Sequence, residues 1–263
     1  MIWVQRAIFL FAFMTTSRAV FGTAIVAFAT GDEGIVVAVD SRQTTKGSGV
    51  AERKGADTDK VVILMNSIAC VSAGAGELIL FDAEKVVFKY DFKEWLTAIA
   101  AKLPKKQFTV SGVAEAVRAT AEDTFKALGH FIGVGKDYTS IFYLIAGFEQ
   151  NIPVIWEIIV TGRTDGIVGT KVTKSAKAIP VHTSFGFKID LSANGLMTQQ
   201  VRIRAPHLLS PPYTVERNAN LAGLMLSIES AVNPAVGPPF ALVIIRPNGI
   251  ERKEWKPDSR TLP

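Results

Sequence analysis

Three residues in the first quarter of the chain could together activate a nucleophile: Thr23, Asp40 and Lys60. Asp40 ends an apolar run, residues 35–39, that is typical of a buried strand. Burying a lone carboxylate costs on the order of several kcal/mol, so Asp40 needs a partner. Lys60 opens the next strand-like run, residues 60–64, and could face it. On the pattern alone, Asp40 and Lys60 could also be solvated strand-end residues with no special role.

The chemistry that these residues suit is attack by a threonine hydroxyl, which is a weak nucleophile unless a base lies beside it. Cleavage after Gly22 would free the α-amine of Thr23, whose ordinary pKa of about 7.7–8.0 suits that base. A nearby Lys60 ammonium would lower the pKa of the amine by like-charge repulsion, and Asp40 would keep the lysine charged and in place. Backbone N–H groups near Gly74, ahead of an expected helix, could stabilise the oxyanion.

The first 22 residues have the pattern of a removable segment. Arg6 precedes an uncharged, mostly apolar run, residues 7–17, which is too short to span a bilayer and is typical of a signal-peptide core. Small residues allow cleavage after Ala19 or after Gly22. The alternatives are a propeptide and an apolar helix that stays inside the cell. A signal peptide would make the protein exported, either periplasmic or secreted, and its absence would leave it cytoplasmic.

Composition excludes several classes of protein. Apolar residues make up 48% and charged residues 20%, which is globular rather than disordered or fibrous. The net charge of +5 is scattered without a basic stripe, so no nucleic-acid partner is expected. After the first 22 residues no run of 18 apolar residues follows, so no membrane segment is expected in the mature form.

Cysteine and histidine usage gives no sign of a cofactor. The single cysteine, Cys70, rules out an internal disulfide and is expected to be a buried apolar residue. Three widely spaced histidines lack metal-ligand spacing, and no metal, nucleotide or flavin is predicted. A Ser-His-Asp triad stays open, although no histidine lies near a nucleophile-elbow pattern.

The hydrophobic pattern predicts one domain, residues 23–263, of sheets covered by helices, without the strict alternation of a doubly wound sheet. Residues 43–59 read as a loop. The expected strands are 23–30, 34–41, 60–64, 67–71, 140–148, 153–160, 240–246 and 250–255, and the expected helices are 77–103, 113–128 (with Ser111 as N-cap) and 214–232.

Four short motifs in this order resemble the proteasome β-subunit family of N-terminal-nucleophile hydrolases: Gly22-Thr23, IVVAVDSR (residues 35–42), DKVV (59–62) and VSAGAGE (71–77). The resemblance implies an α+β fold, a four-layer αββα sandwich of two packed antiparallel sheets flanked by helices.

The same resemblance assigns roles to individual residues. It implies Thr23 as the nucleophile, Gly22 as the residue before the processing cut, Asp40 and Lys60 as the buried acid and its lysine, and Gly74 as the oxyanion-hole amide. It also implies a threonine-type endopeptidase that cleaves peptide or protein substrates and assembles into a homo-oligomeric ring.

The chain departs from that family at some positions. Ala24 follows the nucleophile where a second threonine is frequent, and the family's later active-site serine and aspartate have no clean match in residues 182–192. Two alternatives therefore stay open beside the endopeptidase: a non-catalytic ring or scaffold subunit, and a small-molecule amidase of the same superfamily.

Overall fold

A computed structural model describes twelve segments of the chain. These are residues 24–30, 34–44, 54–57, 60–73, 77–82, 85–128, 141–162, 168–175, 203–209, 212, 214–232 and 236–255. The expected segment of residues 1–22, and with it the boundary at residue 23, lies outside them.

The first of two large sheets is antiparallel throughout, with the strand order β1-β2-β12-β13. Its inner strand β2 is buried along its whole length, as expected for an apolar run enclosed on both faces. The strands are β1 (Ile25–Thr30), β2 (Gly34–Asp40), β12 (Phe240–Arg246) and β13 (Gly249–Trp255).

The second large sheet is also antiparallel and has the strand order β11-β10-β9-β6-β5. Its strands are β5 (Val61–Leu64), β6 (Ile68–Ala73), β9 (Ile141–Glu149), β10 (Ile152–Gly162) and β11 (Val168–Ser175).

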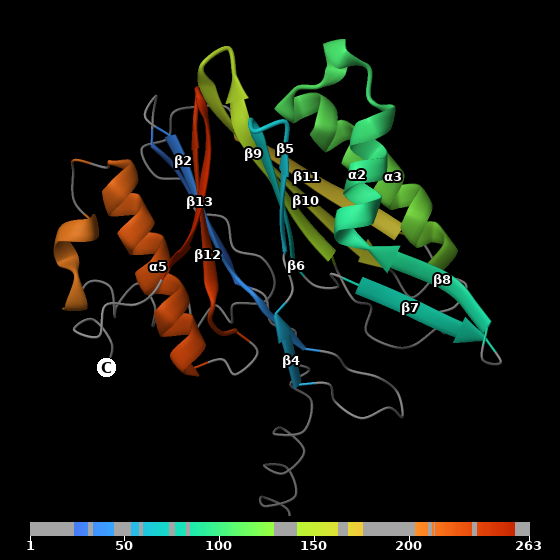
Figure 1. Cartoon of the computed structure of the whole chain (residues 1–263), viewed down its shortest axis with the longest axis horizontal. Coiled ribbons are helices and arrows are strands. Elements are labelled where there is room, and N and C mark those ends of the chain that lie inside the picture. Colours follow the sequence, from blue (N-terminus) through green and yellow to red (C-terminus); the bar gives the residue numbers. More distant parts are fainter. Residues whose placement is uncertain are drawn as a thin grey trace, which may run out of the picture.

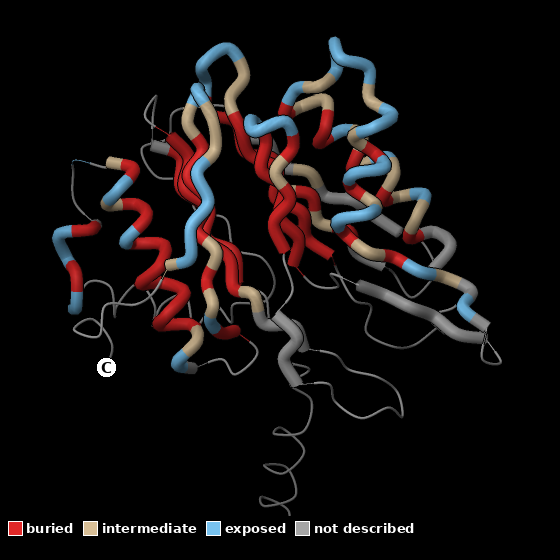
Figure 2. The backbone as a smooth tube through the Cα atoms, in the orientation of Figure 1, coloured by how far each residue is buried: buried red, intermediate tan, exposed pale blue. Residues whose placement is uncertain are grey.

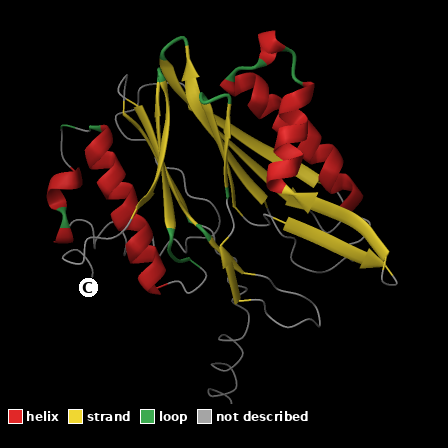
Figure 3. Cartoon of the chain, viewed as in Figure 1, coloured by secondary structure: helices red, strands yellow, loops and turns green. Residues whose placement is uncertain are grey.

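The two sheets pack face to face, and each carries helices on its outer face (Figures 1 and 3). The side chains of β2 alternate between two cores, because successive side chains of a strand point to opposite faces. Val37 and Val39 belong to the core between the sheets. Val36 and Ala38 belong to the core beneath α5 (Val215–Val232). The sequence of layers is therefore helix, sheet, sheet, helix.

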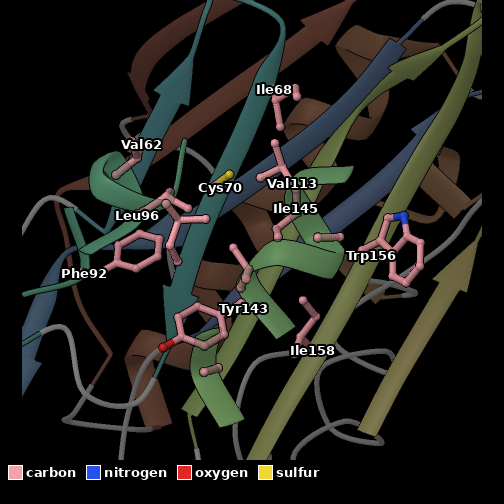
Figure 4. Packing of buried hydrophobic residues seen from close by; sticks show 14 of the residues in the cluster. Val62, Ile68, Cys70, Phe92, Leu96, Val113, Tyr143, Ile145, Trp156 and Ile158 are labelled. Carbon is pink, nitrogen blue, oxygen red and sulfur yellow. The ribbon is translucent and has the colours of Figure 1, made fainter. Parts of the chain in front are cut away.

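The fourth layer consists of α2 (Phe92–Lys102) and α3 (Val110–Leu128), which cover the second sheet. Figure 4 shows Val62, Cys70, Leu96, Tyr143 and Ile145 in the core beneath these helices. Cys70 is buried among apolar side chains, which confirms the expectation for it. The fold is thus α+β, a four-layer αββα sandwich of two packed antiparallel sheets flanked by helices.

The helix expected over residues 77–103 is wrong in its first half. The structure has a two-stranded ribbon there, β7 (Glu77–Asp82) and β8 (Lys85–Asp91), and only then α2. β-branched and aromatic residues favour strands, and the Asp91 side chain accepts the Glu94 N–H at 2.8 Å and so begins the helix at Phe92.

Other differences are smaller. The expected loop over residues 43–59 contains the short paired strands β3 (Arg42–Thr44) and β4 (Lys54–Asp57). Helix α3 begins before Ser111, and Thr109 Oγ1, rather than Ser111, accepts an N–H of its first turn, that of Gly112. Two short 3-10 turns complete the described elements: η1 (Lys105–Gln107) and η2 (Pro206–Leu209).

Candidate active site

The two sheets bring Asp40 and Lys60 together at one end of the sandwich. Asp40 is the last residue of β2, where its backbone N–H donates to the carbonyl of Ala24 at 3.2 Å. Lys60 immediately precedes β5 in the other sheet, and its carbonyl accepts the N–H of Ser72 at 3.2 Å. Each residue is thus held by the backbone ladder of its own sheet, and the pair joins the two sheets.

One oxygen of Asp40 receives two hydrogen bonds. The Lys60 ammonium donates to Oδ1 at 3.2 Å, and the backbone N–H of Ala24 donates to the same atom at 2.9 Å. Asp40 is fully buried and Lys60 almost so. Oδ2 accepts no hydrogen bond of good geometry from the residues that the structure describes. The carboxylate therefore binds both a lysine and the first described amide of the chain.

Burial controls the proton affinity of both partners. It raises the pKa of Asp40 to about 6, against the opposing effects of the Lys60 charge, the Ala24 N–H and, more weakly, the backbone N–H of Gly237. Burial likewise lowers the pKa of Lys60, and the negative charge of Asp40 opposes that change. Burial thus favours the neutral form of each partner, and the opposite charge of the other partner favours the ionised form.

The connection between α5 and β12 closes the site on the side of Asp40. Val236 is buried in the same core as Ala24 and Phe240, Gly237 directs its N–H toward the carboxylate, and Pro239 accepts the Ser41 N–H at 3.2 Å. The described residues of this connection, 236–239, carry no hydroxyl or carboxylate. This connection could not be recognised as part of the site from residue types, because apolar residues and prolines carry no reactive group.

Thr23, Gly22 and Gly74 lie outside the described residues, as do residues 182–192. The strand that leads to Gly74 is described, however, since Ser72 and Ala73 end β6 beside Lys60. The first described element after Gly74 is β7, a strand. The expectation that a helix follows this glycine is therefore wrong, and residues 77–82 supply no helix dipole to an oxyanion site here.

The described residues contain no group of three or more His, Cys, Asp and Glu side chains that could hold a metal ion. No helix among these same residues has the length and apolar character needed to cross a membrane.

No protein-family model matches the chain, and no curated protein matches it. Among solved structures the chain is similar to one described as an Anbu (Gly-1) mutant from Hyphomicrobium sp. strain MC1. The two share 16% sequence identity, the match covers 89% of this chain and 86% of that chain, and the TM-score is 0.48. The sheet orders and the three cores described above define the fold.

Proposed function

We propose that this chain is an N-terminal-threonine hydrolase of the proteasome type, which cleaves peptide bonds with Thr23 as its nucleophile. The observation that carries the proposal is the double hydrogen bond to Asp40 Oδ1, from Lys60 and from the Ala24 N–H. The Ala24 nitrogen belongs to the peptide bond with Thr23. If the chain begins at Thr23, its terminal amine and its hydroxyl belong to the residue directly before Ala24. The Ala24 amide is fixed beside Lys60, because both donate to the same Asp40 oxygen.

In the proposed reaction the Thr23 hydroxyl oxygen attacks the carbonyl carbon of the substrate amide, while its proton passes to the free α-amine of Thr23. The protonated amine then gives a proton to the leaving amine as the amide C–N bond breaks. Water hydrolyses the resulting ester and restores the hydroxyl. Lys60 keeps the pKa of the terminal amine low, Asp40 holds Lys60, and backbone amides at Gly74 receive the oxyanion.

The mechanism requires that the Gly22–Thr23 bond be cut. Since Val20 and Gly22 are small residues at the third and first positions before the cut, removal of an export signal would itself expose the nucleophile. The proposal therefore includes export of the protein and processing by an outside protease. Its assembly into a homo-oligomeric ring is a further part, which native mass spectrometry of the purified protein would test.

The decisive experiment is mass spectrometry of the mature N-terminus together with a peptide-cleavage assay. We expect the mature chain to begin at Thr23, and Thr23→Ala to lower kcat/KM by several orders of magnitude with an unchanged melting temperature. A peptide boronate should label the native protein but not the variant. A mature chain that begins at any other residue would rule out the mechanism.

A specific observation favours a second candidate, a non-catalytic ring or scaffold subunit. Residues 236–239, which border Asp40, have no side chain that could orient a terminal amine or take part in proton transfer. On this reading Asp40 and Lys60 serve only to join the two sheets. An intact Gly22–Thr23 bond, together with no labelling by the boronate, would decide for this candidate.

A further inference from the structure

The end of the sandwich opposite the Asp40–Lys60 pair is formed by turns that converge from three layers. Asn66, in the β5–β6 turn, accepts the N–H of Ile250 in β13 at 3.4 Å, which joins the two sheets. A side chain at Gly147, near the end of β9, would collide with both Val110 of α3 and the Ser67 carbonyl. The β5–β6, β9–β10 and β12–β13 turns and the α2–α3 connection therefore lie together, and we call this end the tip face.

Positive charge is concentrated in the α2–α3 part of the tip face. Lys102, Lys105 and Lys106 are all exposed and lie within five residues of one another. No ion pair joins any of them to another residue in the described part of the chain. Exposed charges of this kind contribute little to stability, so they are available for a partner.

Apolar side chains project from the neighbouring turns. Met65 in the β5–β6 turn is 75% exposed, and Ile152 at the start of β10 is 47% exposed. Figure 2 shows exposed residues along the turns of this edge. Met65 has a φ of 47°, a conformation that favours asparagine or glycine, so the turn itself gives no reason for a methionine at this position.

One carboxylate of this region is already engaged. Glu149, at the end of β9, accepts the Ser111 N–H at 2.6 Å and the Ser111 hydroxyl at 3.0 Å. Its charge is therefore directed into the N-terminus of α3, where the helix dipole favours an anion. Glu149 therefore forms no ion pair with the lysines of the α2–α3 connection, and their positive charge stays exposed.

We propose that the tip face is a docking surface for an acidic segment of a protein partner, with apolar side chains that contact Met65 and Ile152 and carboxylates that face Lys102, Lys105 and Lys106. Methionine suits a surface that must adapt to a flexible segment. The chemistry favours a protein over an anionic membrane, since lipid-binding basic clusters typically contain four to eight positive residues and inserted faces contain more apolar surface. The surface is independent of the Asp40–Lys60 site.

Fluorescence anisotropy with two labelled polymers tests the proposal on the full chain. The probes are poly-glutamate and a random copolymer of glutamate and tyrosine. We expect the copolymer to bind more tightly, and replacement of Lys102, Lys105 and Lys106 by glutamine to weaken binding of both probes roughly tenfold, because each exposed charge pair contributes up to about fivefold. Met65→Asn, which the turn accommodates, and Ile152→Thr should weaken binding of the copolymer alone.

A matched variant controls for net charge: Lys89, Lys93 and Lys253, which are exposed on other parts of the molecule, are replaced by glutamine together. An equal loss of binding in both triple variants would overturn the proposal, as would copolymer binding that is unaffected by Met65→Asn and Ile152→Thr. Vesicles of phosphatidylglycerol provide the third arm. Vesicle binding that depends on the tip-face residues, with copolymer binding that does not, would assign the surface to a membrane and also overturn the proposal.

Discussion

Asp40 accepts, on a single carboxylate oxygen, the ammonium of Lys60 at 3.2 Å and the backbone N–H of Ala24 at 2.9 Å. The two donors come from different sheets, and neither is near Asp40 in sequence. This oxygen therefore links Ala24, the first described residue, to Lys60 in the other sheet.

Lys60→Met should destabilise the protein at pH 8 by about 3–5 kcal/mol, because it leaves the buried Asp40 carboxylate without its counter-charge. The Ala24 N–H can still donate to the carboxylate, so the loss reports mainly on charge. Urea denaturation gives the free energy of unfolding. The double variant Asp40→Asn/Lys60→Met should regain part of the loss, and a double variant with the summed cost of both changes would contradict a coupled pair.

Stability should depend on pH through Asp40. Folding raises the pKa of this carboxyl from 3.8 to about 6, so the folded state binds the proton more tightly. The stabilisation from this group is therefore fully present below about pH 4 and is lost as the pH rises through about 6. Relative to Asp40→Asn, the wild-type chain should be more stable at pH 4 than at pH 8 by about 3 kcal/mol. Urea titrations at several pH values measure this, and a difference that is constant with pH would contradict it.

The buried phenols of Tyr90 and Tyr143 share a hydrogen bond at 2.8 Å, and burial raises the pKa of both. Tyr143→Phe should cost about 1–3 kcal/mol, because it leaves the Tyr90 hydroxyl buried without this partner. The double variant Tyr90→Phe/Tyr143→Phe should be more stable than Tyr143→Phe alone, since no buried hydroxyl is then orphaned. Thermal unfolding followed by circular dichroism distinguishes these outcomes.

Gly223 in α5 lies directly against the indole of Trp255 in β13, so that an added Cβ would overlap the ring. Gly223→Ala should therefore destabilise the protein by about 1–3 kcal/mol, although alanine is the better helix former. In a Trp255→Leu background the same change should cost much less. An equal cost in both backgrounds would show that the indole is not the obstacle.

Much of the secondary structure could be predicted from hydrophobic periodicity. The strand at Phe240–Arg246 matches the expected residues, and the helix Val215–Val232 begins within one residue of its expected start. Local hydrophobic patterns are sufficient to predict a helix or strand that buries one regular face. They failed over residues 77–91, where apolar residues at helical spacing instead form the ribbon of β7 and β8. Short apolar runs fit both periods, and only the pairing of the two strands distinguishes them.

For the candidate site, residue types alone were enough to select Asp40 and Lys60, because a carboxylate that ends a buried strand requires a counter-charge. Their contact across two sheets, the Ala24 N–H as second donor and the approach of Val236 and Gly237 were set by the packing of the sandwich. Backbone amides and apolar connections are alike throughout a sequence, and they acquire a chemical role only from what the fold places beside them.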